Sequence, residues 1–141
     1  MDTCVISELA RPTPNAAVIE WVEGRPEEDL FLSVLTLGEL EKGIAKLTPS
    51  SRRTELATWA HVDLTRRFDG RLLPIGPEVA ARWGSMAGIA ETQGKPLPVI
   101  DSLIAATGLH HDLIVVTRNI DDLERCGARC VNPWRATVGE L

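Results

Sequence analysis

The sequence contains few cysteines, and none of them belongs to a C-x-x-C pair. Its three cysteines, Cys4, Cys126 and Cys130, make an odd number, which argues against a disulfide framework and against a structural zinc site. The spacing of Cys126 and Cys130 would suit one helical face, but Gly127 and the strand-like CVN segment argue against a helix there. We therefore expect three reduced thiols.

Long hydrophobic runs and a leader segment are also absent. Apolar residues make up 44% of the chain and charged residues 25%, which are ordinary globular values, and the apolar runs are too short to cross a membrane. No charged-then-apolar leader precedes a small-residue cleavage site, so we expect a cytoplasmic protein without a membrane partner. A length of 141 residues predicts a single domain, 1–141, large enough to bury one core.

Several catalytic motifs are missing: the chain has no Gly-rich phosphate loop, no HExxH and no GxSxG. A net charge of -5 would also count against nucleic-acid binding, which needs Lys and Arg at phosphates. Positive charge is nevertheless concentrated in one segment, although a solvated helix face is the simpler explanation for it. The arginines of this segment are Arg52, Arg53, Arg66, Arg67 and Arg71.

The apolar pattern predicts strands that alternate with helices. Residues 30–35 form an apolar stretch interrupted only by Ser33, and residues 113–116 form a β-branched run with polar neighbours, as in strands of a buried parallel sheet. We therefore expect an α/β fold with a mainly parallel sheet covered on both sides. The other predicted strands are 72–75 and 130–132. The predicted helices are 5–10, 16–22 (capped by Asn15 and ended by Gly24), 37–46, 51–68 (one or two), 77–93 (with Pro77 in its first turn) and 99–109.

Four carboxylates stand beside the ends of apolar runs at widely separated places: Asp2, Glu39, Asp101 and Asp122. In an α/β fold, the ends of parallel strands converge on one crevice. Acids gathered there would repel one another without a cation. A hard divalent ion prefers such an all-oxygen environment, so the spacing predicts a metal site.

Most of these acids also have a structural explanation. Glu39 would be the N3 residue of a capping box if Thr36 were the N-cap. Asp101 and Asp122 would lie in first helical turns, where the helix dipole favours a carboxylate. Asp2 has no comparable explanation. The metal site is preferred because one arrangement then accounts for all four acids.

The chain resembles a known family in four ordered segments: DTCVISEL, TLGELEKGI, the block IDSLIAATGLHHDLIVVTRNIDDL, and NPW. Together they resemble PIN-domain ribonucleases of the VapC/FitB type, which are toxins of type II toxin–antitoxin pairs. The resemblance implies a three-layer α/β/α sandwich, a Mg²⁺ (or Mn²⁺) cofactor and endoribonuclease activity on RNA. By position, Asp2, Glu39, Asp101 and Asp122 match the catalytic, metal-binding acids of the family.

The resemblance also implies supporting residues and partners. Thr3, Thr117 and Asn119 match polar residues beside the site, although turn chemistry explains the last two equally well. A cognate antitoxin of the VapB type and self-association as a homodimer are implied as well. Exposed apolar residues of the first helices would receive the apolar part of the antitoxin tail. Our candidates are Ile6, Leu9, Val18 and Trp21, with ordinary core packing as the alternative role for about half of them.

Three departures from the family pattern stand out. Only Met1 precedes Asp2, so the first strand of the sheet is expected to be truncated at the N-terminus. Cys4 replaces an Asn and Leu123 replaces a Phe. Asp121 is an adjacent alternative to Asp122, which is preferred because it stands directly before the position of that Phe.

Two other functions stay open from the sequence. A catalytically impaired PIN-like module would mainly bind an antitoxin partner. Phosphoryl transfer to an aspartate, as in haloacid-dehalogenase-like or receiver-like proteins, fits less well. The former needs D-x-D, which the segment from Asp2 to Cys4 lacks, and the latter needs a Lys where Arg118 stands.

Overall fold

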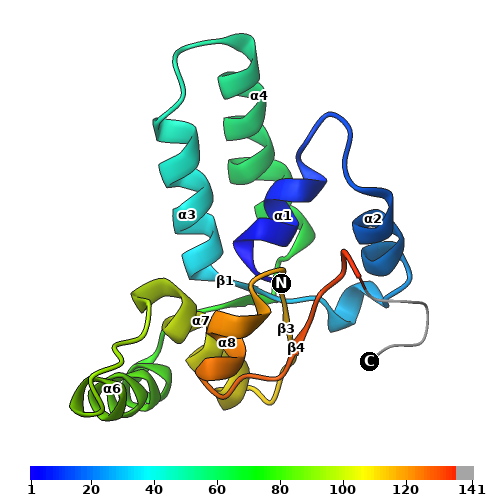
Figure 1. The fold of residues 1–141 in the computed structure, drawn as a ribbon. Coiled ribbons are helices and arrows are strands. Elements are labelled where there is room, and N and C mark those ends of the chain that lie inside the picture. The colour runs from blue at the N-terminus through cyan, green and yellow to red at the C-terminus, as the bar shows by residue number, and fades with distance from the viewer. Residues whose placement is uncertain (136–141) are drawn as a thin grey trace.

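The computed structural model describes residues 1–135, with helices arranged around two pairs of short parallel strands (Figure 1). In the first pair, β1 (Leu32–Ser33) runs beside β2 (Leu72–Leu73), and in the second, β3 (Val115–Val116) runs beside β4 (Cys130–Val131). Helices connect the members of each pair, because parallel strands need a crossover. The predicted α/β fold is confirmed, and residues 136–141 of the predicted domain lie outside the described residues.

The N-terminus lies between the two strand pairs. The amine of Met1 donates to the carbonyl oxygen of Phe31 at 2.8 Å, and the backbone N–H of Asp2 donates to the carbonyl of Val116 at 2.8 Å. These two residues therefore bridge β1 and β3, at the position where the sheet was expected to have its first strand.

The second helix begins and ends where the sequence indicates, whereas the first begins two residues before the predicted range of 5–10 and ends at Leu9. Asp2 is the N-cap of α1 (Thr3–Leu9). The side chain of Asn15 accepts from the N–H groups of Ala17 and Val18 and so caps α2 (Ala16–Glu23), while Gly24 is its C-cap. An asparagine side chain satisfies helix N–H groups that have no carbonyl partner within the helix.

The segment around β1 differs from the prediction. The strand is only two residues long, and α3 (Val34–Ala45) begins inside the apolar run that was expected to be entirely strand. Ser33 is the N-cap, since its Oγ accepts from the N–H of Leu35 at 3.1 Å. Thr36 is fully buried within the helix. The capping-box explanation of Glu39, which required Thr36 as N-cap, is therefore wrong.

The arginine-rich segment forms helix, as expected, and continues through α4, a π-type turn and α5. Later helices also agree with the predictions, including the start of α6 at Pro77. The bounds of these elements are η1 (Glu27–Asp29), α4 (Ser51–Thr58), η2 (Trp59–Leu64), α5 (Thr65–Arg67), α6 (Pro77–Thr92), α7 (Val99–His110) and α8 (Ile120–Arg125). None of the helices within residues 1–135 is both long and apolar enough to cross a membrane.

Two hydrophobic clusters form the core. One gathers around α1, α2, β1 and the fully buried Phe68, and the other joins α7, β3 and α8. Ile6, Val18 and Trp21 belong to the first cluster, and Leu9 packs against it. These residues are therefore part of the core and do not form an exposed groove, which corrects the expectation for the antitoxin-binding surface.

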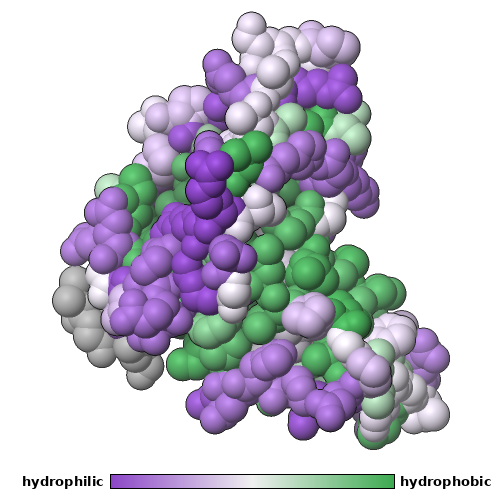
Figure 2. All heavy atoms as spheres, turned by 180° about the vertical axis from the view of Figure 1, so that it is seen from behind, coloured by the Kyte–Doolittle hydropathy of each residue, from purple (hydrophilic) through white to green (hydrophobic). Residues whose placement is uncertain are grey.

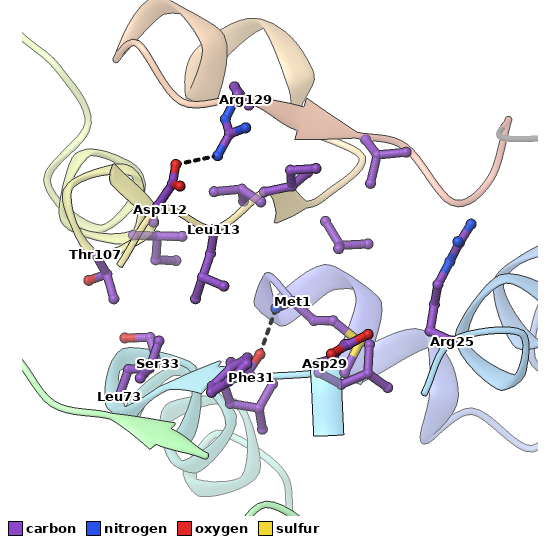
Figure 3. A pocket seen from close by; sticks show the side chains of 18 of the residues that line it. Met1, Arg25, Asp29, Phe31, Ser33, Leu73, Thr107, Asp112, Leu113 and Arg129 are labelled. Carbon is purple, nitrogen blue, oxygen red and sulfur yellow. Dashed lines mark hydrogen bonds and ion pairs between the residues drawn. The ribbon is translucent and has the colours of Figure 1, made fainter. Parts of the chain in front are cut away.

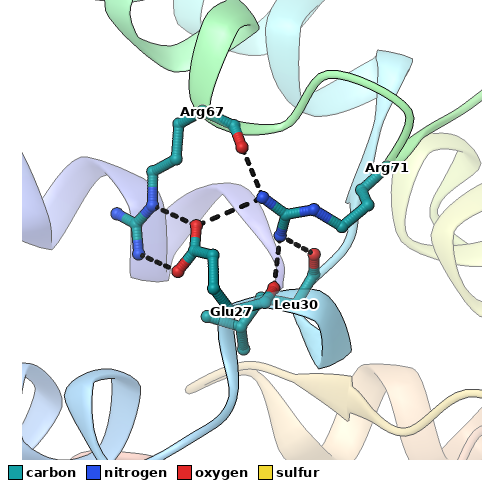
Figure 4. A network of polar contacts seen from close by, with 4 residues as sticks. All are labelled: Glu27, Leu30, Arg67 and Arg71. Carbon is teal, nitrogen blue, oxygen red and sulfur yellow. Dashed lines mark hydrogen bonds and ion pairs between the residues drawn. The ribbon is translucent and has the colours of Figure 1, made fainter.

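A network of polar contacts holds η1 against α5 and β2 (Figure 4). The carboxylate of Glu27 accepts from Nε of Arg67 at 2.7 Å and from Nη2 of Arg71 at 3.3 Å. The guanidinium of Arg71 also donates to the carbonyls of Glu27, Leu30 and Arg67. The hydrogen bond from Arg67 is the main cause of a lowered Glu27 pKa. Two of the clustered arginines thus have structural partners.

Candidate active site

Asp2 is the most buried of the four predicted acids, with 7% of its surface exposed. Its Oδ1 accepts from the N–H of Thr3 at 2.8 Å, which caps α1, and its Oδ2 accepts from the hydroxyl of Thr117 at 2.7 Å. The capping role contradicts the expectation that Asp2 has no structural explanation. An aspartate directly before a helical pattern was the signal that could have shown it.

Glu39 is held beside Asp2 by a threonine. The hydroxyl of Thr3, at the start of α1, donates to Oε1 of Glu39 on α3 at 2.6 Å, and it lies 3.3 Å from the hydroxyl of Thr36. Thr3 follows Asp2 directly, so this contact brings the two acids into one region. The hydrogen bond leaves Oε2 of Glu39 for another ligand.

The loop after β3 brings Asp101 to the same region. The side-chain amide of Asn119 donates to Oδ2 of Asp101 at 3.0 Å. The N–H of Asn119 donates to the hydroxyl of Thr117 at 2.9 Å, and that hydroxyl in turn donates to Asp2. Thr117 thus forms a local turn contact with Asn119 and a long-range contact with Asp2. Turn formation and support of the acids, the two explanations of Thr117 and Asn119 from the sequence, are therefore compatible.

Electrostatics link Asp101 to the other three acids. The pKa of Asp101 is raised, first by desolvation and then by the negative charges of Asp2, Asp122 and Glu39, while the hydrogen bond from Asn119 opposes this shift. Asp122 is half-buried in the first turn of α8, whereas Asp121 is exposed. The four acids therefore lie close enough together for the charges of the other three to act on Asp101.

Cys4 lies at the edge of this group. Its Sγ is 3.8 Å from Oδ2 of Asp2 and 3.7 Å from the hydroxyl of Thr117, and it accepts from the N–H of Arg118 at 3.5 Å. Burial raises the pKa of the Cys4 thiol, so the side chain is a neutral thiol at neutral pH. It therefore adds no further negative charge to the four carboxylates.

The donor set fits a hard divalent cation, although the acids do not form a closed ligand cage. Among residues 1–135, no three His, Cys, Asp or Glu side chains converge closely enough to hold a metal ion as they stand. The chemistry is nevertheless suitable, because the candidate ligands are carboxylate oxygens whose mutual repulsion a cation would relieve. Binding would require the carboxylates to draw closer together.

Comparison with known proteins agrees with the resemblance in the sequence. The PIN-domain family matches residues 1–128. Toxin FitB of Neisseria gonorrhoeae is 36% identical over 134 residues, which are 95% of this chain and 96% of FitB. VapC ribonuclease Y4jK of Sinorhizobium fredii is 34% identical over 134 residues, with the same coverage of 95% and 96%.

A solved structure shares the fold as well. The crystal structure of FitAcB from Neisseria gonorrhoeae matches with a TM-score of 0.88 and 36% sequence identity, over 96% of this chain and 97% of the solved one. The chain therefore belongs to the PIN-domain family. Its relatives in that family carry the names of toxins and ribonucleases of the FitB and VapC type.

Proposed function

We propose that the chain is a Mg²⁺- or Mn²⁺-dependent endoribonuclease and the toxin of a type II toxin–antitoxin pair. The observation that carries this proposal is the way the loop after β3 holds two of the acids, since Thr117 donates to Asp2 at 2.7 Å and Asn119 donates to Asp101 at 3.0 Å. Family membership supports the same activity, since relatives over nearly the whole chain are named VapC ribonuclease and toxin.

In this proposal Asp2, Glu39, Asp101 and Asp122 hold the cation and Thr3, Thr117 and Asn119 keep three of these acids in place. A bound divalent cation supplies a water of lowered pKa and stabilises the charge that develops on the phosphate. The hydroxyl of Thr117 fixes Asp2, and the amide of Asn119 fixes Asp101, at 2.7 and 3.0 Å. The expected products carry a 5′-phosphate and a 3′-hydroxyl.

Arg118 is our candidate for a contact with the RNA backbone. It directly follows Thr117, and its guanidinium lies 4.4 Å above the ring of Trp134. A stacked guanidinium keeps its charge and its planar set of donors, which suit a phosphate. In this position it would bind RNA beside the acids without taking part in holding the cation.

We further propose an antitoxin partner that occupies the cleft between α1, α3 and α4. Solved proteins of this fold include FitAB and VapBC complexes. The cleft has a volume of about 280 Å³, and its lining includes Glu39 together with Leu40, Ile44, Leu56 and Trp59. An apolar tail would fit the lining, and a following Arg would pair with the Glu39 carboxylate. A homodimer within a larger complex remains part of this proposal.

The test replaces Asp101 by asparagine, which keeps the shape of the side chain and removes its charge. Cleavage of RNA in Mg²⁺ should be lost in Asp101→Asn, while circular dichroism stays that of the parent protein. Asp121→Asn is the matched control, because Asp121 is an exposed acid directly before Asp122, and it should retain activity. Full Mg²⁺-dependent cleavage by Asp101→Asn would refute the assignment.

A second candidate function is a PIN-like module that mainly binds its antitoxin. It is favoured by the open arrangement of the acids, no three of which form a ready metal site within residues 1–135. One experiment on the purified chain with Mg²⁺ or Mn²⁺ distinguishes the two functions. The module predicts antitoxin binding without RNA cleavage at any metal concentration, whereas the ribonuclease predicts cleavage that EDTA abolishes.

A further inference from the structure

The helix α8 is short, and its position depends on its contacts with the rest of the fold. It has six residues, fewer than an isolated helix needs to be stable in water, and it packs beside α7 (Figure 1). Its first turn carries Asp122, one of the four acids. Leu123 is its one buried side chain, and it joins the core cluster of Ile104 and Ala105 on α7. One buried side chain is a single point of attachment, so other contacts must set the direction of the helix.

Polar contacts tie both ends of α8 to the segment around the start of α7. At the start of α8, the side-chain amide of its N-cap Asn119 donates to Oδ2 of Asp101 at 3.0 Å. At its end, Nη2 of Arg125 donates to the carbonyl of Lys95 at 2.5 Å and to that of Pro96 at 2.9 Å. These two carbonyls belong to the link between α6 and α7, shortly before Asp101. Contacts at opposite ends fix the direction of a helix, whereas one contact would leave it free to pivot.

The segment that receives Arg125 is itself held in place by α6. Nε1 of Trp83 on α6 donates to Oγ of Ser102 at 2.9 Å, and this hydroxyl donates to the carbonyl of Pro98 at 2.6 Å. Ser102 is fully buried and directly follows Asp101. The start of α7 is therefore fixed against α6, and Arg125 fixes α8 against the start of α7.

The side chain of an arginine suits this contact. A guanidinium carries several N–H donors in a fixed plane, so one group can bond two neighbouring carbonyls. Both partners of Arg125 among residues 1–135 are backbone carbonyl oxygens. The contact therefore constrains geometry without forming an ion pair with any of the four acids.

We propose that Arg125 is a positioning residue of the acid site, which holds α8 against the start of α7 and so keeps Asp122 within reach of a cation bound at Asp101. This inference rests on the proposed function. Without the contact α8 would pivot about Leu123, and Asp122 would have to be ordered when a cation binds, at a cost in affinity. Contacts that fix metal ligands from outside typically change the metal affinity by about 10- to 100-fold.

The charge of Arg125 predicts the opposite effect on cation binding. Arg125 is a cation on the same short helix as Asp122, so its removal would lessen the repulsion of an incoming metal ion and strengthen binding. Loss of positioning would weaken binding. The direction of the change in affinity therefore distinguishes positioning from simple electrostatics.

The experiment measures the affinity of the full chain for Mn²⁺ alone, from the electron paramagnetic resonance signal of the free ion. Arg125→Gln, whose side chain is too short to reach both carbonyls, should weaken Mn²⁺ binding about tenfold. In an Asp122→Asn background the same substitution should change the affinity by less than about twofold, because the positioned ligand is already lost. Amide hydrogen exchange in α8 of the metal-free protein should become faster in Arg125→Gln.

Arg129→Gln is the matched control, because Arg129 is also an exposed arginine but lies away from the acids. Its Nη2 donates to Asp112 at 2.7 Å (Figure 3). Both residues line a cavity of about 430 Å³ between the two strand pairs, and the part of this lining that the structure describes contains none of the four acids. The lining is largely apolar, and hydrophobic side chains gather around a hollow on the rear face of the molecule (Figure 2). Arg129→Gln should therefore leave the Mn²⁺ affinity unchanged.

Several outcomes would overturn the positioning role of Arg125. Arg125→Gln would bind Mn²⁺ as tightly as the parent protein or more tightly, or it would weaken binding equally in the Asp122→Asn background, or hydrogen exchange in α8 would stay the same. An equal loss of affinity in Arg129→Gln would also overturn it. A parent protein that binds Mn²⁺ no better than Asp101→Asn would refute the proposed function, and the positioning role with it.

Discussion

Thr117 offers the sharpest test of how the acids are held. Its side chain is fully buried, its hydroxyl donates to Oδ2 of Asp2 at 2.7 Å, and it accepts from the N–H of Asn119 at 2.9 Å. Thr117→Val keeps the shape and removes both bonds. A hydrogen bond to a buried charged group contributes about 1.5–3 kcal/mol, so the substitution should lower the melting temperature by roughly 5–10 °C in a protein of this size.

The same substitution should also weaken metal binding, because Asp2 loses the group that fixes its second oxygen. We expect a lower RNA-cleavage rate in Mg²⁺ and a smaller rise in melting temperature on adding Mg²⁺ or Mn²⁺ than in the parent protein. Thr117→Ser is the control, since it keeps the hydroxyl and loses only a methyl group. If Thr117→Val matched Thr117→Ser in stability, metal response and cleavage, the reasoning would be refuted.

Three further outcomes are expected. Glu39→Gln should raise the melting temperature in EDTA, because it relieves repulsion between the acids. Ser33→Ala, in contrast, should lower the melting temperature through the loss of a helix cap worth about 1 kcal/mol. A lower melting temperature for Glu39→Gln would mean that Glu39 has a structural role. Burial lowers the pKa of the Met1 amine from 8.0 to about 6, so between these pH values the unfolded chain binds more protons than the folded one. Stability should therefore fall by about 3 kcal/mol as the pH drops through this window, as measured by urea unfolding, and N-terminal acetylation should abolish the difference. Arg71→Lys should destabilise the chain by about 1–2 kcal/mol, because the guanidinium of Arg71 donates to the carbonyls of Leu30, Glu27 and Arg67. A melting temperature equal to that of the parent protein would show that these hydrogen bonds do not stabilise the fold.

The sequence predicted the helices whose ends carry local signals. Asn15 before α2, Gly24 after it and Pro77 at the start of α6 each act through the backbone of their own helix. It also predicted that acids at the ends of apolar runs would gather, because parallel strands end at one edge of a sheet. In the structure the charges of Asp2, Asp122 and Glu39 help to raise the pKa of Asp101, and the role of these acids as metal ligands stays a prediction.

The sequence could not show where β1 ends and α3 begins. The apolar run at residues 30–35 is consistent with either element, because residues of both pack into one core there. It also could not show the contacts that hold the acids. Thr117 bonds to Asp2 across 115 positions of the chain, and Thr3 bonds to Glu39 across 36 positions, so no local pattern records either contact.

The distribution of the site along the chain has a consequence for protein synthesis. Asp2 and Glu39 leave the ribosome early, but the residues that tie the acids together, Thr117 and Asn119, come late among the 141 residues. A growing chain therefore has the first acids for most of its synthesis without the loop that joins them to Asp101. Under the proposed function, the nascent toxin stays inactive until it is almost complete, which gives a co-translationally binding partner time to reach it first.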